Sequence, residues 1–396
     1  MKKSADLVIK NTSQIWSFQG PDRPRVSSEM NQTGLIKEGA IAVKDGIIQW
    51  IGAEVDLLSN VNIDDTTLVF DAENCAVVPG FIEPHTPLVF AGTREDEFSK
   101  KIAGVPYMQI AAEGGGIKRT VKDTRKATEE ELYDLGYARI QEALKLGITT
   151  IEIKSGYGLD FETEVKMLRV AGELAKKTPI TIVRTFLGAH EIPSGREKTE
   201  YLDEVCSKMI PYVAKHNLAE FCDVFCEKGV YTIEEAERVL RTGIEHGLKP
   251  KIHADQMTNS GGAALAARIG AVSADHIDYT DQAGINAMAE AGVVGVLLPG
   301  AVFFLGLKQY PPARNMIDSG VPVAISTDFN PGSCMSLNLH LMMTMAAVTC
   351  RMTIPETFNA VTINAACSVD LQDKLGSLQA GKQADIVVLD CESPEM

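Results

Sequence analysis

The sequence lacks any apolar run that approaches the roughly 18–20 residues needed to cross a lipid bilayer. Two lysines stand near its start, but the apolar stretch after them breaks within a few positions, so we expect no secretory signal peptide. Low-complexity tracts and short solenoid repeats are also absent. The eight cysteines are scattered, many of them in apolar runs, which argues against a disulfide scaffold. These absences predict a cytoplasmic protein with no membrane segment.

Positive charge is in short supply, with 38 lysines and arginines against 53 aspartates and glutamates, a formal net charge of −15. An acidic surface repels phosphate backbones and anionic lipids, so we expect neither a nucleic-acid partner nor a membrane partner. The apolar fraction of 45% and the charged fraction of 23% are ordinary for a globular protein, which excludes extensive disorder. The 396 residues fit two to three domains, or one large α/β barrel with an attachment.

The middle of the chain alternates between apolar runs of strand length and segments with helical periodicity, such as 162–177 and 233–246. Strands that alternate with helices predict a parallel sheet, and eight such units close into a TIM (β/α)8 barrel. No G-x-G-x-x-G follows the first strand, which disfavours an open dinucleotide-binding sheet. The eight runs are 76–82, 148–153, 180–187, 221–226, 249–253, 271–277, 293–298 and 321–326.

Both ends of the chain are rich in strand signals instead. Near the start, two apolar runs flank Asp45-Gly46, a typical hairpin turn, and near the end a turn and a strand occupy 381–390. We therefore expect a β-sandwich domain built from residues 1–78 and 369–396, attached to a barrel domain of residues 79–368.

Polar residues follow nearly every apolar run of the middle segment. In a barrel the carboxyl ends of the strands meet at one face, where barrel enzymes carry out their chemistry. His85, His253 and Asp328 follow the first, fifth and eighth runs. Imidazole nitrogen and carboxylate oxygen suit zinc or iron, and a catalytic site needs about three such ligands plus an open position for water. The sequence therefore predicts a catalytic metal site.

The motifs along the chain resemble those of the imidazolonepropionase family of the amidohydrolase superfamily over nearly the whole length. The resemblance implies hydrolysis of the ring amide of 4-imidazolone-5-propanoate to N-formimidoyl-L-glutamate, a step of histidine degradation. It also implies one metal ion and a homodimer. The motifs are PGFI at 79–82 with His85, REDEF at 94–98, GGGI at 114–117, EIKSGYG at 152–158, FLGAH at 186–190, DVFCE at 223–227, HADQ at 253–256, SADH at 273–276, TDFNPG at 327–332 and the closing strand at 381–390.

One position departs from the family pattern. The family places His-x-His after the first strand, where residues i and i+2 point to the same face. Here the second position is Pro87, whose ring carries no ligand atom. Losing a residue that only supports a ligand typically lowers metal affinity or activity by roughly 10–100-fold. Losing a ligand itself should lower them by at least as much. Three interpretations stay open: a weakened site of His85, His253, Asp328 and extra water, recruitment of His190, or an inactive chain without metal. Weakened binding is the expectation.

The resemblance also implies roles for further residues. The Arg94 guanidinium can hold the substrate carboxylate through two hydrogen bonds. We expect water to lose its proton to His276 or Asp328, with His276 as the first base because Asp328 should stay ionised as a ligand. The implied substrate contacts are Arg94, Tyr157, His190, Gln256, Asn330, Gly332 and Ser333.

Gln256 separates this chain from related deaminases. Those enzymes commonly carry His-x-x-Glu after the fifth strand, whereas here the same spacing from His253 ends in an amide. An amide donates and accepts hydrogen bonds but does not titrate, so it cannot shuttle protons as that glutamate does. We therefore place Gln256 among the catalytic residues as the one that recognises the substrate ring, which argues against deamination. A second metal ion near Lys154 would need its own set of ligands. The sequence shows no such full set, so we expect one ion. A deaminase or other cyclic amidohydrolase, and a pseudoenzyme that only binds ligand, remain the alternatives.

Overall fold

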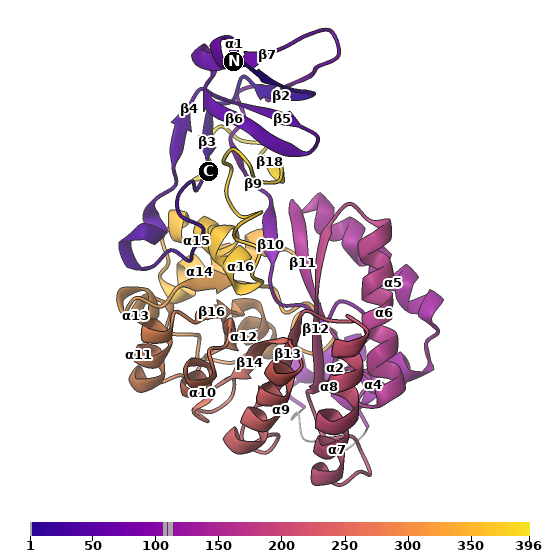
Figure 1. The fold of residues 1–396 in the computed structure, drawn as a ribbon. Helices are drawn as coiled ribbons and strands as arrows, with labels where there is room; N and C mark the ends of the chain where they lie inside the picture. Colours follow the sequence, from indigo (N-terminus) through magenta and orange to yellow (C-terminus); the bar gives the residue numbers. More distant parts are fainter. Residues whose placement is uncertain (1, 106–108, 110–113) are drawn as a thin grey trace.

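The computed structural model describes residues 2–105, 109 and 114–396 of the chain. Eight parallel strands form one sheet in sequence order, and helices surround it (Figure 1). The predicted (β/α)8 barrel is therefore confirmed. Its strands are β10 (Phe81–Glu83), β11 (Ile148–Lys154), β12 (Thr181–Ala189), β13 (Phe221–Cys226), β14 (Lys249–Ala254), β15 (Ser273–His276), β16 (Val294–Leu297) and β17 (Val323–Ile325).

Side chains bridge the junction between the first and last strands of the barrel. The buried Glu83 carboxylate on β10 accepts a hydrogen bond from the backbone N–H of Thr327, just beyond β17, at 3.0 Å. The Ser326 hydroxyl donates to the backbone oxygen of His85 at 3.0 Å. These contacts place the segments that carry His85 and Asp328 side by side.

The barrel helices begin where the sequence provides caps. The Asp160 carboxylate accepts from the Thr163 N–H at 2.7 Å at the start of α6 (Phe161–Lys177), and a capping box of Thr232 and Glu235 opens α9 (Ile233–Glu245). Other helices are α2 (Glu95–Ile102), α4 (Ile117–Lys126), α5 (Glu129–Lys145), α7 (Lys198–Glu204), α8 (Ile210–Lys215), α10 (Gly262–Ile269), α11 (Gln282–Ala291), α12 (Pro299–Leu305), α13 (Ala313–Asp318), α14 (Leu339–Cys350), α15 (Ile354–Ala360) and α16 (Ile363–Ser368). Among the described residues, no helix combines the length and apolar content needed to cross a membrane.

The two ends of the chain meet in a small β-structure at one end of the molecule (Figure 1). One four-stranded sheet has the order β18-β9-β3-β4 and the other β6-β5-β2-β8. A shared apolar core with members such as Ile9, Ile15, Ile41 and Val77 joins strands of both sheets, as expected for a sandwich. The strands are β2 (Leu7–Lys10), β3 (Gln14–Trp16), β4 (Leu35–Lys37), β5 (Gly39–Lys44), β6 (Ile47–Ala53), β8 (Leu68–Asp71), β9 (Val77–Pro79) and β18 (Ile386–Val388), with β1 (Lys3–Ser4) and β7 (Val61–Asn62) as a separate pair.

Two local predictions for this part of the chain have different outcomes. The hairpin is confirmed, because β5 and β6 pair antiparallel around Asp45 and Gly46, whose φ angles of 51° and 74° are left-handed. The first apolar run, predicted as one strand over 76–82, is divided instead. Its first part, β9, pairs with β18 of the sandwich, and its second part, β10, pairs with β11 of the barrel, with Gly80 between them. The run therefore links the two sheets.

Candidate metal centre and active site

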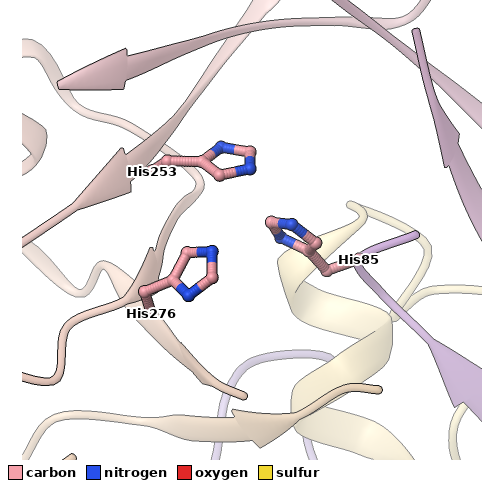
Figure 2. A group of neighbouring side chains, drawn as sticks. All are labelled: His85, His253 and His276. Carbon is pink, nitrogen blue, oxygen red and sulfur yellow. The ribbon is translucent and has the colours of Figure 1, made fainter. Parts of the chain in front are cut away.

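Three histidines from three barrel strands lie together at the carboxyl ends of the strands. His85 follows β10, His253 lies on β14 and His276 is the last residue of β15. One nitrogen of each ring lies within 4.8 Å of the other two, and all three side chains are buried. Figure 2 shows the three rings facing one another across a shared space. Imidazoles arranged in this way can hold a zinc or iron ion.

Asp328 lies at the edge of the three-histidine group. Its Oδ1 atom is 3.7 Å from Nε2 of His85, and its Oδ2 atom accepts a hydrogen bond from the Ser333 hydroxyl at 2.9 Å. Burial raises the pKa of the Asp328 carboxyl to about 6, against the opposing effect of the Ser333 hydrogen bond. The structure thus brings together the three predicted ligands His85, His253 and Asp328.

Buried carboxylates support two of the histidines from behind. Nδ1 of His85 lies 2.6 Å from Oδ2 of Asp275, and Nδ1 of His253 lies 3.0 Å from Oδ2 of Asp223. At His85 the hydrogen-bonded carboxylate leaves Nε2 available for an ion and fixes the orientation of the ring, whereas Asp223 faces His253 as an ion-pair contact. Burial, followed by the charge of Lys154, lowers the pKa of His85 well below its ordinary value. The ring is therefore neutral near pH 7, which is the form that binds metals.

His276 has no such support. Its Nδ1 atom is buried and has no hydrogen-bond partner among the described residues. Its backbone is left-handed, with a φ of 76°, and the β-branched Ile277 after it has a φ of 56°. Both conformations are unusual for these residue types, and strained backbone of this kind gathers at functional sites. Burial, followed by the charges of His253 and His85, lowers the pKa of His276 well below its ordinary value.

A network of buried charges lies beneath the histidines. The Lys154 ammonium is 2.8 Å from Asp223, 3.1 Å from Glu152 and 3.3 Å from Asp275, and Lys251 is 3.0 Å from Glu152. None of these side chains is exposed. Burial acts to lower the pKa of Lys154, but the three carboxylates outweigh it and raise that pKa above its ordinary value. His85, Glu152 and Asp275 form a second possible ligand group, yet Lys154 already supplies a cation to its carboxylates. In this structure the Lys154 ammonium therefore balances the charge of these carboxylates.

The expected weakening of the metal site by Pro87 is not shown. Pro87 is buried two residues beyond His85, as the sequence pattern implied. That expectation counted His85 and His253 as the remaining histidines and assigned His276 to catalysis. In the structure His276 completes a group of three, so the cluster is intact. The signal in the sequence was the SADH motif at the end of the sixth run.

His190 lies beside the cluster but is not part of it. Its ring centroid is 5.8 Å from that of His253 and 5.5 Å from that of Tyr157. Its Nδ1 atom lies 3.0 Å from the backbone oxygen of Gly156, and burial lowers the pKa of the ring to about 4. Within the described residues His190 is absent from the groups that could hold an ion, which gives no support to its recruitment as a ligand.

Arg94 lies against the loop that follows β17. Its Nε atom donates to Glu97 at 2.9 Å, a pairing that the sequence analysis did not identify. A Cβ atom on Gly332 would come within 2.4 Å of Nη1 of Arg94, so a larger residue there would displace the guanidinium from its present position. Glu97 also accepts from the Gly116 N–H at 3.1 Å, which ties the glycine-rich loop to Arg94. Two predicted substrate contacts, Arg94 and Gly332, are therefore neighbours.

Asn330 organises the loop that carries Asp328. Its amide donates to the backbone oxygen of Asp328 at 2.7 Å and to the Ser333 hydroxyl at 2.6 Å. Its carbonyl accepts from the backbone N–H groups of Gly332 and Ser333, both at 2.8 Å. Gln256 is half-buried beyond the end of β14, and its side chain makes no hydrogen bond to the described part of the chain. The loop is thus preformed, whereas the Gln256 amide has no partner in the part of the chain that the structure describes.

Comparisons with known proteins agree with this geometry. Residues 76–395 match the Amidohydrolase family. The imidazolonepropionase of Alkaliphilus metalliredigens (strain QYMF) is 46% identical over 385 residues, which cover 97% of this chain and 91% of that protein. The imidazolonepropionase of Clostridium tetani (strain Massachusetts / E88) is 43% identical over 394 residues, which cover 99% of this chain and 93% of that protein.

Solved structures show the same fold at much lower identity. An adenosine deaminase from Xanthomonas campestris with bound zinc superposes with a TM-score of 0.72 at 18% identity, covering 98% of this chain and 86% of that one. A 5-methylcytosine deaminase from Klebsiella pneumoniae gives 0.74 at 16% identity, covering 98% and 93%. The chain therefore belongs to the amidohydrolase family and, within it, is a metal-dependent hydrolase of the imidazolonepropionase group.

Proposed function

We propose that this chain hydrolyses the ring amide of 4-imidazolone-5-propanoate to N-formimidoyl-L-glutamate. The observation that carries the proposal is the buried group of His85, His253 and His276 with Asp328 beside it, at the face where the Arg94 loop also lies. The identity of 43–46% to imidazolonepropionases over nearly the full length supports the same reaction.

We assign one metal ion to the face of His85 and His253 next to Asp328. These residues fit an ion, because their carboxylate partners leave both Nε2 atoms available and the rings are buried. When bound, the ion supplies Lewis acidity and lowers the pKa of a water to roughly 7. Imidazole and carboxylate accept zinc and iron alike, so both metals stay in the proposal, and zinc is present in the related adenosine deaminase structure.

The substrate carboxylate is assigned to Arg94. Its Nε atom is already bonded to Glu97, so the two Nη atoms beside Gly332 remain for the carboxylate. The imidazolone ring is assigned to Tyr157, His190 and Gln256, and the open-chain product to Asn330, Gly332 and Ser333. The unengaged Gln256 amide suits this assignment, because it has both a donor and an acceptor to offer a ring.

We assign proton transfer from water to Asp328, although the sequence favoured His276 as the first base. The Ser333 hydroxyl holds Oδ2 of Asp328, and Asn330 holds its backbone, so the carboxylate is oriented at the edge of the cluster. An oriented carboxylate can take a proton from water and pass it to the departing ring nitrogen. Among the residues that the structure describes, the Nδ1 atom of His276 has no hydrogen-bond partner to orient the ring.

Turnover measurements test the proposal directly. Zinc-loaded and iron-loaded preparations of the purified enzyme are each assayed with 4-imidazolone-5-propanoate. The same preparations are assayed with a panel of aminoheterocycles that release ammonia when hydrolysed. We expect formimidoylglutamate from the first and no ammonia from the panel. Ammonia release from an aminoheterocycle would favour the alternative deaminase, and binding of imidazolone-like ligands without turnover would favour the alternative pseudoenzyme.

Three broader assignments belong to this proposal. We divide the chain into a sandwich domain of residues 1–78 and 369–396 and a barrel domain of residues 79–368, a division supported by the pairing of β18 with β9. We place the protein in the cytoplasm, supported by eight cysteines that are all free thiols. We also propose a homodimer, which sedimentation analysis of the purified enzyme can test.

A further inference from the structure

We infer that His276 is a metal ligand in this chain and takes the coordination position that Pro87 leaves without a donor. The inference rests on the proposed metal-dependent function for the location of the ion. It changes the role of His276 from a proton carrier to a ligand. Its test measures metal binding separately from turnover.

The first step concerns the segment after β10. Pro87 is buried two residues after His85, in the segment that follows the end of β10. A proline ring has no atom that can coordinate an ion. The first strand therefore contributes His85 alone, and a third nitrogen must come from another element.

The second step is the position of His276. It lies on β15 and pairs in register with Ala254 of β14, next to His253. Its ring centroid is 5.5 Å from that of His85 and 5.3 Å from that of His253, and the three nitrogens lie within 4.8 Å of one another. Ions hold imidazole nitrogens at about 2.0–2.1 Å, so two ligand atoms of one ion are at most about 4 Å apart. Small ring movements bring the group into a coordination sphere.

The third step is the unpaired nitrogen of His276. Its Nδ1 atom is buried without a hydrogen-bond partner among the described residues, so a polar atom inside the site is left for a ligand to satisfy. The backbone of His276 is left-handed, and Figure 2 shows its ring directed toward the space that it shares with His85 and His253.

Two competitors for the position are engaged elsewhere. His190 lies 3.0 Å from the Gly156 backbone oxygen and is outside the group. Asp328 has Oδ2 bonded to Ser333 and Oδ1 3.7 Å from Nε2 of His85, so Oδ1 supplies an oxygen in addition to the three nitrogens. The geometry therefore favours a centre of three histidines with Asp328.

A double-mutant cycle on positions 87 and 276 tests the inference. The proteins are the wild type, His276→Asn, Pro87→His and the double variant; asparagine suits the left-handed backbone at 276. Zinc affinity is measured by competition with a chromogenic chelator, and the coordination of cobalt(II) by its visible absorption spectrum. His190→Ala and the exposed His216→Ala serve as controls.

We expect His276→Asn to weaken zinc binding by about 10–100-fold or more in the wild-type background. With histidine at position 87 the same change should have a much smaller effect, because a third nitrogen is again present. The two controls should keep wild-type affinity. Equal affinity of the wild type and His276→Asn, or an equal loss in both backgrounds, would overturn the inference, and a loss in His190→Ala alone would assign the position to His190.

A measurement on the unaltered protein covers the case in which His276→Asn does not fold. X-ray absorption of the zinc-loaded wild type should show three imidazoles, and two would contradict the inference. The proposed function can fail independently of this result. If the cycle follows the expected pattern but 4-imidazolone-5-propanoate is not hydrolysed, the ligand assignment holds and the proposed reaction is wrong.

Discussion

The barrel centre and the terminal sandwich are stabilised in opposite ways. Beneath the histidines, Lys154 pairs with both Glu152 and Asp223, and all three side chains are fully buried. The interior shared by the two terminal sheets is apolar, with residues such as Ile15 and Ile41 at its centre. Apolar burial stabilises a fold without regard to direction, whereas buried charges stabilise it only when every partner is present. In this chain the interactions that depend on every partner being present, which we call conditional, are concentrated around the site.

The largest effect should come from removing the central cation. Lys154→Met leaves the carboxylates of Glu152, Asp223 and Asp275 without their shared ammonium. We expect unfolding to become easier by about 3–5 kcal/mol, together with loss of metal, because those carboxylates also support His85 and His253. Urea denaturation and metal analysis measure both effects.

The same substitution in the sandwich is the matched control. Lys44 is half-buried, with 41% of its side chain exposed, and lies 3.7 Å from Asp6, so Lys44→Met should change the free energy of unfolding by less than about 1 kcal/mol. If the two substitutions had similar effects, the distinction between conditional and unconditional interactions would be refuted.

A cavity in the sandwich should reduce stability without altering the chemistry. Ile41→Ala removes buried methyl groups from a fully buried side chain, and we expect a loss of about 2–5 kcal/mol in the free energy of unfolding. Metal content and kcat per folded molecule should stay at wild-type values at a temperature where the variant is folded. A specific fall in kcat would show that the sandwich is coupled to the site.

At the site, Ser333→Ala should reduce activity with little loss of stability. Ser333→Ala removes the hydroxyl that holds Oδ2 of Asp328. We expect kcat/KM to fall by about 10–100-fold through the misplaced carboxylate, with less than about 1 kcal/mol of stability lost because Ser333 is half-buried. Steady-state kinetics and thermal melting, measured on the same preparation, separate the two quantities. Unchanged kcat/KM would remove Asp328 from the proposed role.

The smallest effect concerns an ion pair near the sandwich. A hydrogen bond from Arg23 lowers the pKa of Glu29 to about 2, below its ordinary 4.5. A lowered carboxyl pKa means that the pair stabilises the fold above pH 4.5 and loses this contribution as the pH falls toward 2. Both side chains are substantially exposed, so Glu29→Gln should cost less than about 1 kcal/mol at pH 7. Urea titrations of both proteins at pH 7 and pH 3 should show the difference shrinking; a constant difference contradicts the assignment.

Local patterns predicted the architecture well because each depends on a short stretch of chain. The alternation of apolar runs and helical segments predicted the barrel, and the Asp45-Gly46 turn predicted the hairpin of β5 and β6 in the sandwich. The first run was predicted as one strand because nothing local indicates that β9 pairs with β18, more than 300 residues away in sequence. Long-range pairing of this kind is absent from any single window of sequence.

The candidate site was predictable to a similar extent. His85, His253 and Asp328 stand at strand ends, and the structure places them at one face. The pairing of Arg94 with Glu97 and the packing of the guanidinium on Gly332 depend on how two loops meet, so the sequence alone did not reveal them. The role of Lys154 as a cation shared by three carboxylates likewise appears only once strands from different parts of the chain are adjacent.

The order of residues by itself determined that this chain forms a barrel with chemistry at the carboxyl ends of its strands, because parallel strands necessarily present those ends on the same side. Only the tertiary structure decided that the ring of His276 lies together with those of His85 and His253. The distances between imidazoles on different strands depend on barrel closure, register and backbone strain, and no spacing along the chain encodes them.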